Sequence, residues 1–93
     1  MNVTAVQVII VGRVQGVWFR GWMKQEARAR DLRGWVRNRR DGSVEAVIAG
    51  RPEVVDDMVA LCWHGPLAAN VSSVVARPAP DQGYVGFTHL PTI

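Results

Sequence analysis

The chain has 93 residues, of which 48% are hydrophobic and 20% charged, with nine glycines and five prolines. A chain of this length and composition supports one hydrophobic core, so we expect a single folded domain over residues 1–93 and exclude a disordered or fibrous protein. Eleven basic residues against eight acidic ones give a net charge of +3, which is compatible with nucleic acid or small phosphorylated anions as partners and selects neither.

The first half of the chain predicts a strand, a helix and a hairpin. Residues 4–11 (TAVQVIIV) are rich in β-branched side chains, which is typical of a short, buried, interior strand. Apolar side chains recur at helical spacing from Phe19 onward, which predicts a helix of about a dozen residues. The alternating segments 32–38 and 43–49 flank an Asp-Gly pair, which supplies the positive φ that a tight hairpin requires.

The second half predicts one more helix and two strands. Pro52 suits the first position of a helix that ends before His64-Gly65-Pro66, and strands are expected at 71–76 and 84–89. The order strand, helix, strand, strand, helix, strand, plus a terminal strand, predicts an α+β fold: a ferredoxin-like split βαβ sandwich (βαββαβ), with an antiparallel sheet and two helices on one face. This fold carries enzymes and RNA binders alike, so only the site can indicate the function.

The segment between the first strand and the first helix, GRVQGVWFR at 12–20, is the main candidate site. Backbone N–H groups are free at a helix N-terminus and favour an anion, and Gly12 and Gly16 let the loop curl so that these groups converge. Arg20 opposes the helix dipole at a cost of up to about 1 kcal/mol, unless its guanidinium binds an oxyanion. An exposed, unengaged Arg20 is the alternative. No Lys-Ser/Thr follows Gly16, so a nucleotide–magnesium site is not expected.

Several segments, in this order, resemble the acylphosphatase family over nearly the whole chain: GRVQGVWFR at 12–20, GWVRN at 34–38, DGSVE at 41–45 and WHGPLAANV at 63–71. The resemblance implies a ferredoxin-like fold and a metal-free, cofactor-free hydrolase that converts acyl phosphates to a carboxylate and inorganic phosphate. It also implies that Asn38 orients the attacking water and that Arg20 holds the phosphoryl group together with the backbone amides of Gln15, Gly16, Val17, Trp18 and Phe19. Met23 stands where the family often has Thr, which removes a hydroxyl group.

Acyl-phosphate hydrolysis suits these residue types. The leaving carboxylate has a pKa of about 4 and needs no strong general acid. Positioned donors on the phosphoryl oxygens stabilise the transition state, and the water needs alignment more than deprotonation. An amide at Asn38 can align the water, whereas a carboxylate there would repel the dianionic substrate.

Other residues support weaker interpretations. Cys62 has Ala68 rather than Arg six positions later, so we expect it to be core packing and not a phosphatase nucleophile. His64 and His89 lack partners at metal-ligand spacing, so we expect surface or core positions and no metal site. Trp18 is a candidate to flank the acyl group.

The alternative function, from a different class, is a ferredoxin-like RNA-binding module. The first strand offers no aromatic side chain for stacking bases, so we expect a small-molecule acyl phosphate as partner and no nucleic acid. A third possibility is the acylphosphatase-like domain of a larger carbamoyl-transfer maturation protein, which the length of 93 residues disfavours. No apolar run reaches the ~20 residues of a membrane span and one cysteine cannot form an internal disulfide, so we expect a cytoplasmic monomer with no membrane partner.

Overall fold

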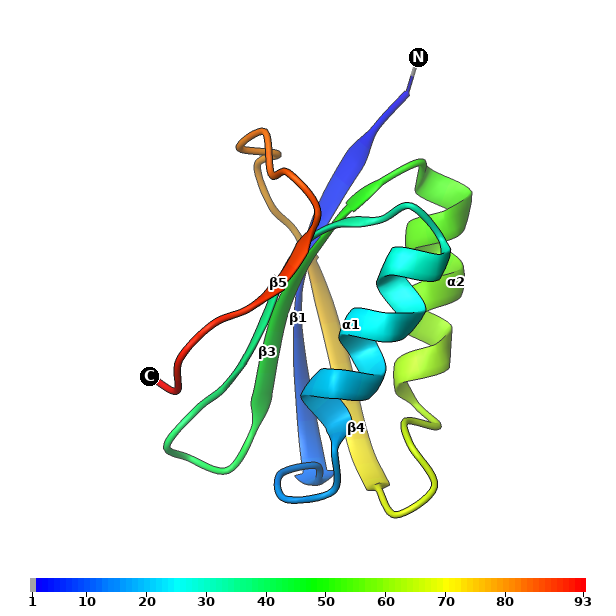
Figure 1. The fold of residues 1–93 in the computed structure, drawn as a ribbon. Coiled ribbons are helices and arrows are strands. Elements are labelled where there is room, and N and C mark those ends of the chain that lie inside the picture. The colour runs from blue at the N-terminus through cyan, green and yellow to red at the C-terminus, as the bar shows by residue number, and fades with distance from the viewer. Residues whose placement is uncertain (1) are drawn as a thin grey trace.

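Two helices pack on one face of a five-stranded sheet in the computed structural model, which describes residues 2–93 (Figure 1). The predicted order of elements is confirmed. In chain order the elements are β1 (Thr4–Arg13), α1 (Phe19–Ala29), β2 (Arg33–Asn38), β3 (Val44–Gly50), α2 (Pro52–Cys62), β4 (Asn70–Pro78) and β5 (Phe87–His89). Neither helix in this part of the chain is long and apolar enough to cross a membrane.

The strands lie in the order β4-β1-β3-β2-β5, so β1 is an interior strand as predicted. Four of the strands pair antiparallel, but β5 pairs parallel to β2, and the sheet is therefore mixed rather than wholly antiparallel. The connection after β4 crosses one end of the sheet to its other edge, and β5 then runs back in the direction opposite to β4 (Figure 1). This direction is the direction of β2. The last strand was predicted at residues 84–89, but β5 is shorter and covers only Phe87–His89.

The core lies between the helices and the sheet. Helix α1 buries Phe19, Met23 and Ala27, which confirms the helical spacing of apolar side chains predicted from Phe19 onward, and α2 buries Val55, Met58 and Cys62. Burial of each large apolar side chain contributes about 1.5–3 kcal/mol of hydrophobic free energy. This packing fixes the N-terminus of α1 against the end of the sheet where β1 stops.

The hairpin between β2 and β3 forms where it was predicted. The Asp41 carboxylate accepts hydrogen bonds from the backbone N–H of Ser43 at 2.9 Å and from its hydroxyl at 2.6 Å. Gly42 adopts a φ of 93°, the left-handed conformation that glycine permits most readily. The hairpin places the end of β2 near the loop that precedes α1.

Candidate active site

Three residues with positive φ shape the end of β1 and the loop that leads to α1: Gly12 at 133°, Gly16 at 72° and Trp18 at 67°. Gly12 lies at an irregularity in the pairing of β1 with β4. A Cβ atom at Gly12 would lie 2.3 Å from the carbonyl oxygen of Asn70, so only glycine fits there. Gly16 has open space around it, and its backbone conformation alone favours glycine.

A shallow pocket of about 190 Å³ lies where this loop, the first turn of α1 and the ends of β2 and β5 meet; its lining residues are Val14, Gly16, Trp18, Phe19, Arg20, Gly21, Asn38 and His89. Five residues of the predicted site therefore come together. Gln15 and Val17 do not line the pocket. Val17 is buried at 9% exposure and anchors the loop.

Helix α1 presents an N-terminus with no neutralising group. Among the described residues, no side chain caps it and no acidic residue lies in its first turn. Arg20 is only partly exposed, yet within residues 2–93 it makes no ion pair or side-chain hydrogen bond. The helix N-terminus and the guanidinium thus leave a local excess of positive charge, which favours an anion.

Asn38 ends β2 with 9% of its surface exposed. Its side-chain oxygen Oδ1 is buried and has no hydrogen-bond partner within residues 2–93. A buried polar atom without a partner costs about 1–3 kcal/mol, and native structures rarely keep one without a reason. Asn38 lines the pocket, which makes a molecule that enters the pocket a candidate partner for this oxygen.

Gln15 connects the loop to the hairpin. Its side-chain Nε2 donates to the carbonyl oxygen of Arg39 at 2.7 Å and to that of Ser43 at 2.8 Å. Both partners lie on the hairpin that follows Asn38. The side chain of Gln15 therefore holds the loop and Asn38 at a fixed separation, a role that the sequence did not indicate.

Trp18 lies at the mouth of the pocket with 63% of its surface exposed. Its indole covers Gly21, where an added Cβ atom would lie 2.2 Å from the indole nitrogen. Phe19, by contrast, is 1% exposed and packs edge-on against Trp22, with ring centroids 5.2 Å apart. Phe19 anchors the helix, while Trp18 remains free to contact a ligand.

His89 lines the pocket, and the sequence interpretation did not connect it with the site. His89 is exposed at the surface, which is one of the two locations, surface or core, that the sequence analysis expected for it. The sequence could not indicate that His89 lies near Arg20, because the two residues are far apart along the chain. Only the pairing of β5 with β2 brings them together. Partial burial, followed by the positive charges of Arg20 and Lys24, lowers the pKa of His89 below its ordinary value.

The remaining candidates lie outside the pocket. Cys62 is fully buried in the core, and burial raises the pKa of its thiol to about 12. Met23 is also fully buried, so the residue that replaces the family's Thr fills the core and does not face the pocket. His64 lies beyond the end of α2 at a different part of the surface. Residues 2–93 contain no group of three or more His, Cys, Asp or Glu side chains that could hold a metal ion.

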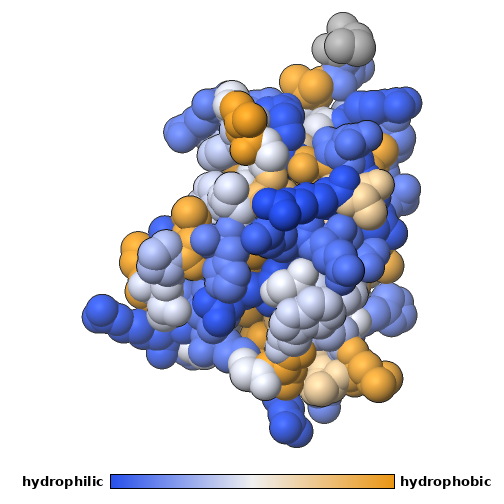
Figure 2. Space-filling view, in the orientation of Figure 1, coloured by the Kyte–Doolittle hydropathy of each residue, from blue (hydrophilic) through white to orange (hydrophobic). Residues whose placement is uncertain are grey.

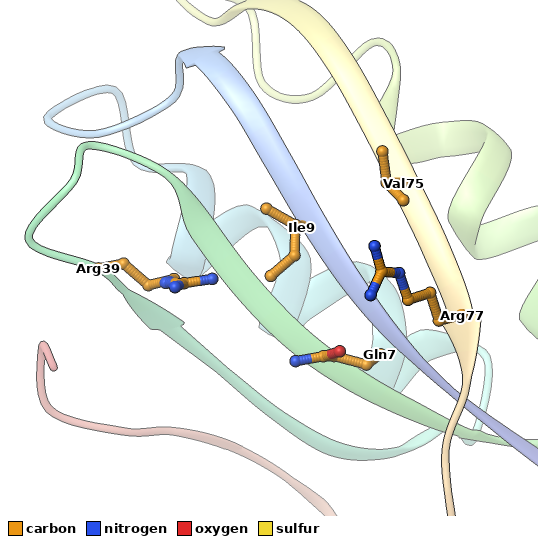
Figure 3. A pocket seen from close by; sticks show the side chains of 5 residues that line it. All are labelled: Gln7, Ile9, Arg39, Val75 and Arg77. Atoms are coloured by element: carbon orange, nitrogen blue, oxygen red, sulfur yellow. The ribbon is translucent and has the colours of Figure 1, made fainter.

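A second hollow, of about 370 Å³, lies on the helix-free face of the sheet and is lined by Gln7, Ile9, Arg39, Val75 and Arg77. Figure 3 shows the guanidinium groups of Arg39 and Arg77 pointing toward Ile9 from opposite sides. The hollow has no helix N-terminus, and no residue of the predicted site lines it. Although it is larger, it offers fewer groups for phosphoryl chemistry than the pocket at Arg20.

The fold is that of a ferredoxin-like α+β protein, and its pocket lies at a helix N-terminus where the local charge favours an anion. The profile of the acylphosphatase family matches residues 6–89, and the chain belongs to this family. The resemblance seen in the sequence is thereby confirmed. Acylphosphatases are hydrolases that cleave acyl phosphates, and the alternative of an RNA-binding module is not favoured.

Relatives of similar length agree with this assignment. The acylphosphatase of Bradyrhizobium diazoefficiens is 57% identical over 79 residues, which cover 85% of this chain and 80% of that protein. The acylphosphatase of Nitrobacter hamburgensis is 57% identical over 93 aligned residues, which cover 94% of each chain. The solved structure of an acylphosphatase from Coxiella burnetii has a TM-score of 0.93 and 34% identity, over 96% of this chain and 94% of that one.

Proposed function

We propose that this chain hydrolyses carboxyl–phosphate anhydrides in the pocket at Arg20, without a metal ion or cofactor. The observation that carries the proposal is the buried Oδ1 of Asn38, which has no partner within residues 2–93 and belongs to a residue that lines the same pocket as Arg20 and the first turn of α1. The Oδ1 of Asn38 suits a water molecule, whereas Arg20 and the N-terminus of α1 suit a dianion.

The phosphoryl group binds at the N-terminus of α1. Arg20 donates two parallel N–H groups to phosphoryl oxygens, and the backbone amides of residues 15–19 donate to the others. Donors that the fold positions before the reaction starts stabilise the transition-state charge without reorganising. Arg20 and the amides supply the charge compensation that a metal ion supplies in many other phosphoryl-transfer enzymes.

Asn38 holds the attacking water in line with the bond that breaks. Its Oδ1 accepts a hydrogen bond from the water, whose oxygen attacks phosphorus. The bond between phosphorus and the acyl oxygen breaks, and its electron pair leaves with the carboxylate. One water proton passes to a phosphoryl oxygen, so a dianionic substrate gives one carboxylate and one dihydrogen phosphate. No general base is needed, because a loose transition state demands little nucleophilic push.

The substrate is a small molecule, and the protein acts as a cytoplasmic monomer with no nucleic-acid partner. Figure 2 bears on the monomer alone: the face that it shows, which carries α1 and β5, is mostly hydrophilic, and its hydrophobic side chains form small separate groups. A broad docking surface is usually a larger apolar patch. Sedimentation at increasing concentration tests the monomer, and a second species would contradict it.

Hydrolysis of benzoyl phosphate in the presence of a chelator tests the mechanism. We expect full activity with chelator, and a loss of about 100- to 1,000-fold in kcat when Arg20→Ala or Asn38→Ala removes a positioned group. Arg51→Ala is the matched control, since Arg51 is exposed and pairs with Glu53 at the start of α2. Normal turnover by Arg20→Ala would overturn the mechanism, and loss of activity on adding chelator would show that a metal takes part.

A further inference from the structure

His89 reaches the pocket from the last strand of the sheet. In the parallel pairing of β5 with β2, His89 lies opposite Val36, two residues before Asn38. The next residue, Leu90, donates its backbone N–H to the carbonyl oxygen of Val36 at 2.9 Å, which fixes this register. The imidazole therefore lines the same pocket as Arg20 and Asn38.

The groups around His89 are cationic or neutral. Arg20 and Lys24 lie one turn apart on α1, and Arg28, one turn further, donates its Nε to the carbonyl oxygen of Phe87 at 3.1 Å. On β2 the neighbouring pocket group is Asn38, which is uncharged. No carboxylate is among the residues that line the pocket. Partial burial and then the charges of Arg20 and Lys24 lower the pKa of His89, so these surroundings favour the neutral imidazole in the free protein.

A bound dianion reverses the sign of this environment. Two negative charges in a pocket of about 190 Å³ lie close to every group that lines it. They oppose the repulsion from Arg20 and Lys24 and favour the imidazolium, which can then donate a hydrogen bond to an oxygen of the dianion.

We propose that His89 contacts the phosphoryl group and takes up a proton when the dianion binds. The proposal rests on the proposed binding of the phosphoryl group at Arg20. His89 would be a third cationic contact beside Arg20 and the helix N-terminus, formed only in the complex. The free pocket thereby avoids a third positive charge that would have no anion to neutralise it.

Proton uptake makes anion binding depend on pH in a defined direction. A group that is more basic in the complex than in the free protein strengthens binding at low pH. This gain is lost as the pH rises through the window between its two titration midpoints. A midpoint difference of about one pH unit gives about a tenfold change in the dissociation constant across that window.

Sulfate is the probe for this test, because it is a tetrahedral dianion that does not itself titrate near neutral pH. NMR of the imidazole group of His89 follows its titration with and without sulfate. We expect sulfate to raise the midpoint of His89. We also expect the sulfate dissociation constant to rise about tenfold between about pH 5.5 and about pH 8 in the wild type, and less than about twofold in His89→Gln. His64→Gln is the matched control and should behave like the wild type.

The outcomes separate this inference from the proposed function. Sulfate binding that depends on Arg20, with an unchanged His89 midpoint or with the full pH dependence retained in His89→Gln, overturns the role of His89 and leaves the phosphoryl site standing. Sulfate binding that Arg20→Ala does not weaken overturns both. Circular dichroism verifies that His89→Gln folds; should it not fold, the wild-type titration decides the question alone.

Discussion

Gln15 donates a hydrogen bond from its side-chain Nε2 to the carbonyl oxygen of Arg39 over 2.7 Å, although the two residues are 24 positions apart. Arg39 directly follows Asn38, and a second bond from the same nitrogen reaches Ser43 at 2.8 Å. One side chain thus joins the loop that we propose holds the phosphoryl group to the segment next to Asn38, which we propose aligns the water.

Replacing Gln15 with Ala should reduce catalysis more than it disturbs the fold. The carbonyl oxygens of Arg39 and Ser43 keep the backbone N–H donors of Gly42 and Arg39, so the loss is that of two ordinary hydrogen bonds, about 0.5–1.5 kcal/mol of unfolding free energy each. The shift between loop and hairpin should lower kcat by up to about 100-fold, because small misplacements of reacting groups are costly. Steady-state kinetics and urea denaturation measure the two effects. Gln25→Ala, at an exposed position on α1, is the control; a Gln15→Ala enzyme with normal kcat would contradict a positioning role.

Trp18 should affect the choice of acyl group. Its exposed indole at the pocket mouth can stack on an aromatic acyl group but gains little from an acetyl group. We expect Trp18→Ala to raise KM for benzoyl phosphate about 3- to 10-fold, in line with about 1 kcal/mol for an aromatic pair, and to change KM for acetyl phosphate much less. Trp63→Ala removes a tryptophan of similar exposure at the end of α2 and should change neither value. Equal effects of Trp18→Ala on both substrates would rule out this contact.

Glu45 should make the protein sensitive to acid. Burial opposes its ionisation, but hydrogen bonds from Arg37 at 2.8 Å and Gln7 at 2.7 Å prevail and hold its pKa below the ordinary 4.5. A carboxyl group with a lowered pKa in the folded state stabilises the fold above its unfolded pKa, and this contribution is lost as the pH falls through the folded value. We expect Glu45→Gln to be about 1–3 kcal/mol less stable at pH 7 and to lose less stability on acidification.

Urea denaturation of wild type and Glu45→Gln at several values between neutral and acidic pH measures this difference. Glu53→Gln is the matched control, because Glu53 is well exposed and pairs with Arg51 at the surface. Identical acid sensitivity of wild type and Glu45→Gln would show that another carboxyl group is responsible.

Cys62 should be chemically inert while the protein is folded. Burial raises the pKa of its thiol to about 12, and only the thiolate reacts with disulfide reagents. A group with a raised folded pKa contributes stability that is present below its unfolded pKa and lost as the pH rises above that value, so Cys62 stabilises the fold at neutral pH. We expect no reaction with an aromatic disulfide at pH 8 until urea unfolds the chain. Rapid labelling of the native enzyme would contradict the packing of α2.

Local patterns in the sequence predicted most of the fold. The spacing of Phe19, Met23 and Ala27 gave the buried side of α1, and the Asp-Gly pair gave the hairpin, because both depend on residues that are close along the chain. The resemblance to acylphosphatases supplied Arg20 and Asn38, and the structure places both in one pocket. Their roles remain predictions until the variants are measured.

Contacts between distant segments were not predictable in the same way. The resemblance implied a role only for the backbone amide of Gln15, and nothing in the residues near it indicates Arg39 or Ser43 as partners of its side chain. The parallel direction of β5 depends on the path of the preceding connection across the sheet, for which no local pattern exists. His89 was missed for the same reason, since its relation to Arg20 exists only in that register.

The short strand β5 also covers the outer edge of β2. Beyond its ladder, Gly34 donates to the carbonyl oxygen of Gly86 and Ile93 donates to that of Asn38, so the outer side of β2 is bonded along its length. An unpaired strand at the edge of a sheet is a template for pairing with a second molecule. Detachment of residues 86–93 would therefore withdraw His89 and at the same time expose β2 to intermolecular sheet growth, so that aggregation would accompany inactivation.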